Sequence, residues 1–360
     1  MDRPVKKVNF VFPNVPHILS GGLKMVFEYA NRLTQRGYEV GIVFNCDWGF
    51  YHARMYIPYF IKRYFLYPTL IKYHPRWFKL NPKVKKSFVT TIVDKEMPDA
   101  DAIIATAVMT APPIAKLSPS KGKKIYFIQG FENWSKEWPD SRVMSTYRLG
   151  LKNIVVAKWL EEKVEEAGAD CTVIPNGLDF TTFNIDTPIR ERTGHKISML
   201  YHEAPEKGAK YGLKAIKQLK RIYPDLEAHL FGVPPRPGDL PKWIHYTQYA
   251  TETQLREIYN QSTIYMCSSV AEAFGLTGAE AMACGAAYVS SDYGGVHEYA
   301  TDGRNVLLSP PKDIDGLVSH VSYLFEHPEE RIRLAENGYN DIQAFSWEKA
   351  LDKFEKVLQS

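Results

Sequence analysis

The segment STIYMCSSVAEAFGLTGAEAMACGAAYVSSDYGGVHE, residues 262–298, constrains the fold more than any other part of the chain. Apolar runs at residues 262–267 and 286–291 predict two buried strands. Residues 277–284 predict a helix that ends at Gly285. A strand, a glycine-bearing turn, a helix and a strand in this order are typical of a parallel sheet that presents helix N-termini to anions.

Two carboxylates flank the start of this predicted helix. Glu272 lies in the loop and Glu280 in the first part of the helix. If a diphosphate bound the helix start, Glu280 would be placed to accept hydrogen bonds from a sugar diol. The pair Thr277 and Glu280 also has the spacing of a capping box, in which Glu280 only bonds back to the helix start. The local spacing by itself leaves both interpretations open.

The whole string around these carboxylates resembles a family signature. It reads Glu272-Ala-Phe274-Gly275-Leu276-Thr-Gly-Ala-Glu280-Ala-Met-Ala-Cys-Gly285. It is similar to the E-x7-E signature of retaining family-4 glycosyltransferases with the GT-B fold, of the bacterial polysaccharide type. The resemblance implies that Glu272 is a catalytic residue facing the donor sugar and that Glu280 holds the ribose hydroxyls. It places Phe274, Gly275 and Leu276 among the donor-binding residues.

The same resemblance extends to a phosphate-binding string further upstream. His202-Glu-Ala-Pro-Glu-Lys207-Gly is similar to the family pattern R-x-x-x-x-K-G, whose two cations neutralise the donor diphosphate. Lys207 matches and is implied to be catalytic. His202 stands where arginine is expected, and a neutral imidazole offers no bidentate fork. Gly232 and Tyr249 are implied to lie beside the nucleobase.

The first part of the chain resembles the family only in outline. Gly21 and Gly22 precede a predicted helix over residues 23–35, and they are similar to the glycine-rich first loop that contacts the donor. Gln129 and Glu132 follow a predicted strand in a string similar to F-I-Q-x-x-E of polysaccharide glycosyltransferases. We take both as acceptor-side candidates, with a bond from Glu132 to a loop backbone as the alternative.

The resemblance also implies the domain organisation. The fold class is α/β, of GT-B type, with two Rossmann-like domains that face each other across a cleft. An acceptor-side domain is expected over residues 1–180 and a nucleotide-sugar-binding domain over 181–345, with polar residues 180–194 as the linker. The helical stripe in residues 346–360 is expected to return to the first domain.

Composition limits the class of protein. Of the 360 residues, 45% are apolar and 24% charged, which is an ordinary globular mixture. The net charge of +4, without a recognisable motif, argues against nucleic acid as a partner. No apolar run is long enough to span a membrane. Four cysteines without metal-ligand spacing suit a reducing, cytoplasmic compartment. Asp99 and Asp101 form a D-x-D triplet but lack a third ligand nearby, so no metal site is predicted.

Residues 48–93 differ in character from the rest of the chain. They contain nine lysines or arginines and no acidic residue, interleaved with tyrosine, phenylalanine and tryptophan. Such a segment forms either a solvated basic face packed on the sheet or a surface that binds an anionic membrane. The second interpretation places the protein peripherally on the inner face of the cell membrane.

The function that the resemblance implies is transfer of a hexosyl or deoxyhexosyl unit from a nucleoside-diphosphate sugar to an acceptor hydroxyl. It would serve cell-surface polysaccharide or glycan assembly, with a glycan or lipid-linked acceptor and no cofactor besides the sugar nucleotide. Two alternatives remain. One is a nucleotide-sugar epimerase of the same architecture. The other is a non-catalytic module that binds sugar nucleotides, suggested by His202 alone.

Overall fold

The computed structural model describes residues 5–15, 20–46, 78–133 and 135–360. The chain divides into two compact units: unit 1 is Met1–Ile174 with Ala350–Ser360, and unit 2 is Pro175–Lys349. The division therefore falls before residue 180. Its reason is packing, because Leu178 and Phe183 are buried in the core of unit 2. The Leu178 amide also donates to the Phe345 carbonyl at 2.8 Å.

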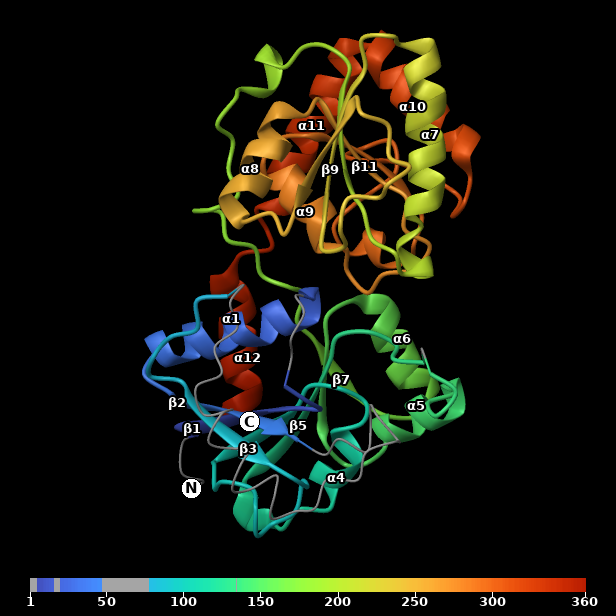
Figure 1. Ribbon diagram of the computed structural model, residues 1–360. Coiled ribbons are helices and arrows are strands. Elements are labelled where there is room, and N and C mark those ends of the chain that lie inside the picture. The colour runs from blue at the N-terminus through green and yellow to red at the C-terminus, as the bar shows by residue number, and fades with distance from the viewer. Residues whose placement is uncertain (1–4, 16–19, 47–77, 134) are drawn as a thin grey trace. The chain divides into compact units, whose positions relative to one another are not determined.

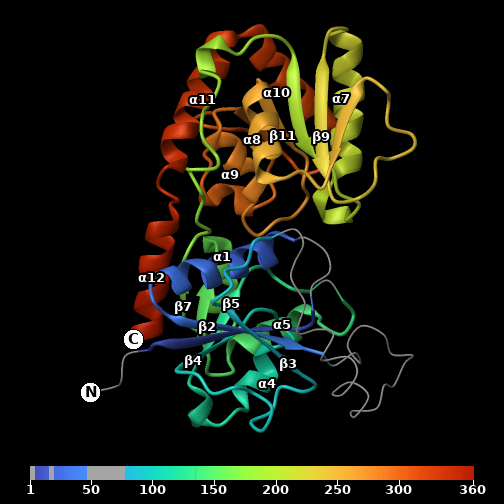
Figure 2. The same cartoon turned by 60° about the vertical axis from the view of Figure 1, so that its left-hand side comes forward.

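Unit 1 contains one parallel sheet with the strand order β3-β2-β1-β4-β5-β6-β7. Its elements are β1 (Lys7–Phe12), α1 (Gly21–Gln35), β2 (Glu39–Asn45), β3 (Lys85–Val89), β4 (Ala102–Ala105), α4 (Ala111–Ala115), β5 (Lys123–Ile128), α5 (Asp140–Tyr147), β6 (Lys152–Val155), α6 (Lys158–Glu166) and β7 (Cys171–Val173). The order reverses between β1 and β4, which is where ligands bind in open α/β sheets. Helices α1 and α4 cover opposite faces of the sheet (Figures 1 and 2).

The last helix, α12 (Trp347–Gln359), begins in unit 2 and contributes its later residues to unit 1. Its apolar stripe explains this. Phe354 is fully buried and its ring lies 4.5 Å from that of Tyr29 and 6.2 Å from that of Phe10. On the polar side, Arg36 pairs with Asp352 at 2.7 Å. Aromatic burial thus holds the C-terminus on the face of the sheet that α1 covers.

Unit 2 contains a second parallel sheet with the order β10-β9-β8-β11-β12-β13. Its elements are β8 (Lys196–Leu200), α7 (Ala209–Ile222), β9 (Glu227–Gly232), β10 (Ile244–Gln248), α8 (Glu252–Gln261), β11 (Ile264–Cys267), α9 (Leu276–Ala283), β12 (Ala287–Ser291), β13 (Leu307–Ser309), α10 (Ile314–Glu326) and α11 (Pro328–Ile342). Alternate residues of the buried strands feed two cores. One core lies under α7 and α10 and the other under α8 and α9 (Figure 1). The fold class is thus two parallel-sheet, Rossmann-like units, as predicted.

The interpretation of residues 180–194 as a polar linker is wrong. Arg192 is only 5% exposed, and its guanidinium donates to the carbonyls of Thr187, Tyr259 and Cys284. Burial of a charged group requires such hydrogen bonds, and here they tie the segment to the core of unit 2. Ile189 packs beside Gly285.

The basic segment and the expected lack of a membrane-spanning run can be compared with the structure only over the described residues. Residues 48–77 of the basic segment lie outside the described residues. Residues 78–93 are described and include β3, where Lys85 pairs with Glu39 at 2.6 Å on the surface. Among the helices of the described ranges, none has both the length and the apolar character needed to span a bilayer.

Candidate functional site

The loop between β11 and α9 brings together the two residues assigned to catalysis. Lys207 ends a short 3-10 helix after β8, and its Nζ lies 3.2 Å from Oε2 of Glu272. The Glu272 carboxylate is nearly buried, with 8% of its side chain exposed, whereas 28% of Lys207 is exposed. Ser269 donates its hydroxyl proton to the other oxygen of Glu272. The carboxylate is thereby held by a cation and a hydroxyl, and the cation keeps access to solvent.

Helix α9 starts one residue earlier than the sequence indicates, and this bears on the capping-box interpretation of Glu280. Its N-cap is Gly275, in the left-handed conformation with φ 86°, and no side chain caps the helix. The hydroxyl of Thr277 instead accepts a hydrogen bond from Tyr265 at 2.7 Å. The capping-box alternative is therefore wrong, because Thr277 lies inside the first turn.

Glu280 is a buried carboxylate with a defined partner. It is 5% exposed, and its Oε2 accepts a hydrogen bond from the hydroxyl of Tyr259 at 3.3 Å. A buried carboxylate is expensive without such bonds. Neither Tyr259 nor Ser269 was singled out from the sequence. Ser269 stands three residues before Glu272 in a loop, which is a usable signal, but nothing local marks Tyr259.

Phe274 differs from Gly275 and Leu276 in what it can offer a ligand. Phe274 is 2% exposed, and its ring lies 5.1 Å from that of Tyr299 and 6.0 Å from that of Phe345. Its side chain is therefore part of the core, and only its backbone can face a donor. Gly275 and Leu276 contribute the first peptide groups of α9, whose N–H groups point out of the helix start.

His202 is neutral near pH 7. Burial lowers its pKa, and the neighbouring charge of Lys207 lowers it further. Its Nδ1 accepts the Ala204 amide proton at 3.0 Å. The proton of the neutral ring is then on Nε2, which can donate one hydrogen bond. The position thus supplies a single neutral donor where a guanidinium would supply a charged fork.

Gly232 and Tyr249 also lie together. The Tyr249 amide donates to the Gly232 carbonyl at 2.9 Å, and Tyr249 is 57% exposed with a positive φ of 52°. A Cβ at Gly232 would stand 2.2 Å from the Tyr201 carbonyl oxygen, so only glycine fits there. Gly232 ends β9 and Tyr249 directly follows β10, so both lie at the same edge of the unit 2 sheet as the loop carrying Glu272.

In unit 1 the predicted residues gather at the start of α1 and the end of β5. Helix α1 begins at Gly21 with Ser20 as N-cap, whose hydroxyl accepts the Leu23 amide proton at 3.4 Å. A Cβ at Gly22 would lie 3.4 Å from Oε1 of Gln129. This oxygen is buried and has no hydrogen-bond partner within the described ranges. An acceptor without a partner beside a helix start is unusual in a native protein.

Glu132 contacts a loop backbone, as the alternative interpretation expected. Its carboxylate accepts the Val108 amide proton, from the loop after β4. Burial raises the pKa of Glu132 to about 7, although the Val108 amide favours the ionised form. The carboxyl is therefore poised to exchange a proton near neutral pH.

The D-x-D triplet has structural partners. Asp99 pairs with Lys121 at 2.7 Å, and Asp101 accepts the amide protons of Lys6 and Lys7 at 2.9 and 2.8 Å. Across the part of the chain that the structure describes, no cluster of three or more His, Cys, Asp or Glu side chains could hold a metal ion.

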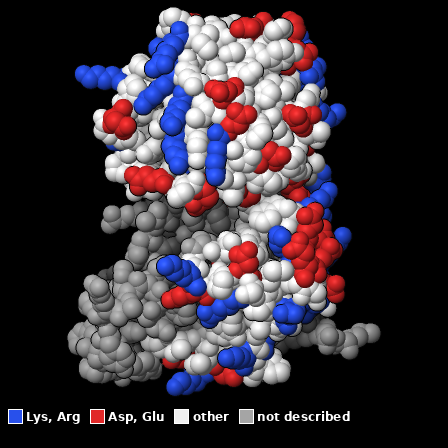
Figure 3. Space-filling view, turned by 90° about the vertical axis from the view of Figure 1, so that its right-hand side faces the viewer, with Lys and Arg blue, Asp and Glu red and all other residues white. Residues whose placement is uncertain are grey.

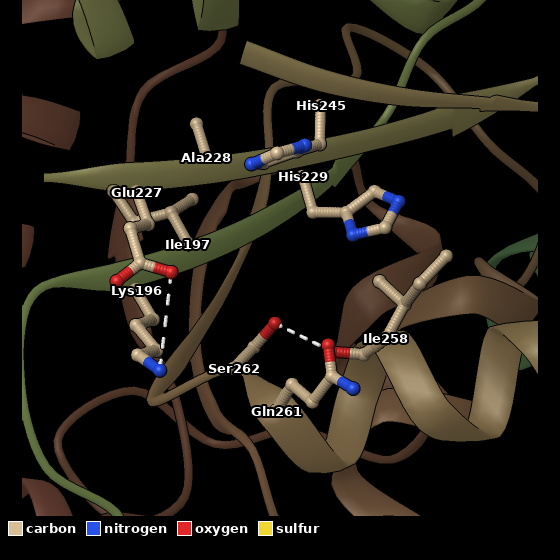
Figure 4. Close-up of a pocket in the computed structure, with 9 residues that line it drawn as sticks. All are labelled: Lys196, Ile197, Glu227, Ala228, His229, His245, Ile258, Gln261 and Ser262. Carbon is tan, nitrogen blue, oxygen red and sulfur yellow. Dashed lines mark hydrogen bonds and ion pairs between the residues drawn. The ribbon is translucent and has the colours of Figure 1, made fainter. Parts of the chain in front are cut away.

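Two further surface features belong to unit 2. A cavity of about 280 Å³ opens at the amino ends of β8–β10, away from the predicted donor residues, and Figure 4 shows His229 and His245 on its wall. Helix α7 carries five basic and no acidic residues. Figure 3 shows Lys and Arg side chains in a column on the face that α7 covers.

Comparison with known proteins supports the fold and the class of site. Residues 189–341 match the family described as glycosyl transferases group 1. The chain is 24% identical over 209 residues to the phosphatidyl-myo-inositol mannosyltransferase of Mycolicibacterium smegmatis, covering 55% of this chain and 54% of that protein. It is 24% identical over 315 residues to the lipopolysaccharide 1,2-N-acetylglucosaminetransferase of Salmonella typhimurium, covering 79% and 80%. The match therefore spans about half the length of the first relative.

The fold of the whole chain is similar to that of a solved structure. Anabaena Alr3699/HepE, in complex with UDP and glucose, superposes with a TM-score of 0.73 at 15% identity, covering 98% of this chain and 99% of that one. The chain has the GT-B fold. The match to glycosyl transferases group 1 lies within unit 2.

Proposed function

We propose that this chain is a retaining glycosyltransferase of family-4 type. It transfers a hexosyl or deoxyhexosyl unit from a nucleoside-diphosphate sugar to the hydroxyl of a glycan or lipid-linked acceptor in the assembly of a cell-surface polysaccharide. The observation that carries the proposal is the constellation at the start of α9. There the paired Lys207 and Glu272, the buried Glu280 and the first amides of the helix lie within the residues that match the family.

The proposed reaction breaks the bond between the sugar C1 and the diphosphate oxygen. The acceptor oxygen bonds to C1 on the face that the diphosphate leaves, and the acceptor proton passes to a departing diphosphate oxygen. Negative charge grows on that diphosphate, and pre-oriented donors lower the barrier most where charge develops. Lys207 is the cation available for this. Its partner Glu272, 3.2 Å away, would release it to the phosphate and turn toward the donor sugar.

We propose the remaining assignments as follows. Glu280 accepts from the ribose hydroxyls alongside Tyr259. Neutral His202 donates one hydrogen bond from Nε2, and Gly232 with Tyr249 borders the base. In unit 1, Gly22 lies beside Gln129, and Glu132 accepts the Val108 amide proton. We assign Gly21 and Gly22 to the donor, and Gln129 and Glu132 to the acceptor.

The test is an activity panel. Purified protein is incubated with UDP-, GDP-, ADP- and dTDP-sugars, with and without lipid-linked and soluble glycan acceptors, and released nucleoside diphosphate is measured. We expect release that depends on acceptor for one base and a loss of at least about a hundredfold in Lys207→Ala, which is the scale for removal of one oxyanion-stabilising group.

The same panel separates the alternatives. Conversion of the donor without acceptor would indicate an epimerase. Binding of sugar nucleotide without turnover on every acceptor would indicate a non-catalytic module. A product with inverted anomeric configuration, read by proton NMR, would contradict the retaining assignment.

A further inference from the structure

Three buried tyrosine hydroxyls form a continuous chain beneath the start of α9. Tyr288 on β12 lies 3.2 Å from Tyr293, Tyr293 lies 2.9 Å from Tyr299, and Tyr299 donates to the carbonyl of Gly275 at 2.8 Å. All distances join hydroxyl oxygens except the last. The three residues are between 0% and 6% exposed. The function proposed above assigns no role to any of them.

The direction of the protons along this chain follows from counting. Each hydroxyl has one proton. Tyr299 donates its hydroxyl proton to the Gly275 carbonyl. At its contact with Tyr293 the Tyr299 oxygen must therefore accept a hydrogen bond. Tyr293 then donates to Tyr299 and accepts from Tyr288. The Phe274 carbonyl is another possible acceptor for the Tyr293 proton, but its oxygen lies farther from the Tyr293 hydroxyl, at 3.4 Å. Burial raises the pKa of all three tyrosines, so the hydroxyls stay protonated at physiological pH.

Helix α9 has glycines where the hydroxyls approach it. A Cβ at Gly275 would stand 2.0 Å from the Tyr293 hydroxyl, and a Cβ at Gly278 would stand 2.5 Å from that of Tyr288. These are not contacts that a side chain could tolerate. The two glycines and the tyrosines therefore depend on each other, and the hydroxyls reach the backbone of the helix start directly.

The carbonyl at the end of the chain belongs to the same peptide group as the Leu276 amide. A hydrogen bond accepted by a carbonyl polarises its peptide group and makes the attached N–H a stronger donor. Successive hydrogen bonds in a chain reinforce this effect in a low dielectric. No described residue accepts the Leu276 or Thr277 amide proton in the hydrogen bonds of the structure. These two amides are therefore available to a ligand.

We propose that Tyr288, Tyr293 and Tyr299 are positioning residues that hold the Gly275 peptide in place and strengthen the Leu276 amide as a donor to the diphosphate of the bound nucleotide. The proposal rests on the function proposed above for this site. It predicts a gradient: Tyr299 matters most because it touches the carbonyl, and Tyr288 matters least because it acts through two other hydroxyls.

The first test needs no ligand. Protein labelled with 15N-leucine is studied by TROSY NMR as wild type, Tyr299→Phe and Tyr288→Phe. Phenylalanine keeps the ring and its ring current and removes only the hydroxyl. We expect the Leu276 amide proton to move upfield in Tyr299→Phe and by less in Tyr288→Phe. An unchanged Leu276 resonance in a folded Tyr299→Phe protein would overturn the proposal.

The second test measures affinity by calorimetry. The probes are the nucleoside diphosphate that wild type binds most tightly among UDP, GDP, ADP and dTDP, and the matching nucleoside. Tyr299→Phe should weaken diphosphate binding about two- to fivefold, since cooperative polarisation strengthens a bond by a modest fraction. Nucleoside binding should stay unchanged. Equal weakening of both probes would mean a structural role only and would also overturn the proposal.

Ile216→Val is the matched control for stability. Ile216 is fully buried on α7, in the other core of unit 2, and its truncation lowers stability without touching the hydroxyl chain. We expect a lower melting temperature with an unchanged Leu276 resonance and unchanged affinities. If Ile216→Val shifts them as Tyr299→Phe does, the effect is general loosening and the proposal fails. If wild type binds none of the four nucleotides, the proposed function fails. The NMR measurement would still test whether the tyrosine hydroxyls polarise the Gly275 peptide group.

Discussion

Replacing Glu132 with glutamine should stabilise the protein above neutral pH. The Glu132 carboxyl accepts the Val108 amide proton in a site whose burial raises its pKa to about 7. Above that pH the folded protein must hold a carboxylate in poorly solvated surroundings. Glutamine offers the same amide a carbonyl oxygen and carries no charge, so it mimics the protonated carboxyl at every pH.

The magnitude follows from the difference between the two pKa values. An ordinary glutamate has a pKa of 4.5 and Glu132 one of about 7, which corresponds to about 3 kcal/mol at 1.36 kcal/mol for each tenfold change. The folded state binds the proton more tightly than the unfolded state does. Wild-type stability is therefore fully retained below pH 4.5, falls between pH 4.5 and 7, and stays reduced above pH 7.

The assay is urea unfolding of wild type and Glu132→Gln, followed by circular dichroism between pH 5 and 8.5. The stability difference should grow from about 1 kcal/mol at pH 5 toward about 3 kcal/mol at pH 8 in favour of glutamine. Glu162→Gln is the matched control, because Glu162 is exposed on α6 in the same unit. A difference that stays constant over the whole range would refute the reasoning, since it would show that Glu132 does not titrate there.

Three further predictions concern the ligand and the surroundings. Glu280→Gln should weaken donor binding by about 1.5–3 kcal/mol, the value of a hydrogen bond to a charged group, and unchanged affinity with a lower melting temperature would make Glu280 purely structural. Transfer activity should persist in excess EDTA, because Lys207 and backbone amides are the proposed partners of the diphosphate. If EDTA abolished activity and a divalent metal restored it, the reaction would need a metal, and Asp99 and Asp101 would be the candidate ligands. The basic segment should bind anionic vesicles in co-sedimentation, less at high salt and less when Lys62, Arg63 and Lys72 become glutamine, since each basic residue contributes about 1 kcal/mol near an anionic surface. The charge-matched control is glutamine at Lys210, Lys214 and Lys217 on α7, and equal loss in both triple variants would contradict a specific role of the segment.

Local patterns were sufficient to predict most elements and to place Glu272 and Glu280 around the start of one helix. The strand, loop and helix around Glu272 and Glu280 are visible because strand and helix periodicity and glycine stops are properties of neighbouring residues. Lys207 could be named from its string for the same reason. The first unit was less predictable, since residues 48–77 lack such a pattern and β3 follows them as a strand of mixed polarity.

Hydrogen-bond partners and burial were decided by the tertiary structure. The pairing of Lys207 with Glu272 joins residues on different elements, and so does the bond from Tyr259 to Glu280. The sequence favoured neither the helix start at Gly275 nor the burial of Arg192. In both cases long-range contacts outweighed a plausible local alternative: tyrosine hydroxyls at the Gly275 carbonyl, and carbonyls from three segments around the guanidinium. A polar group bonds to whichever partner the fold brings within about 3 Å, and in a parallel sheet that partner is usually distant along the chain.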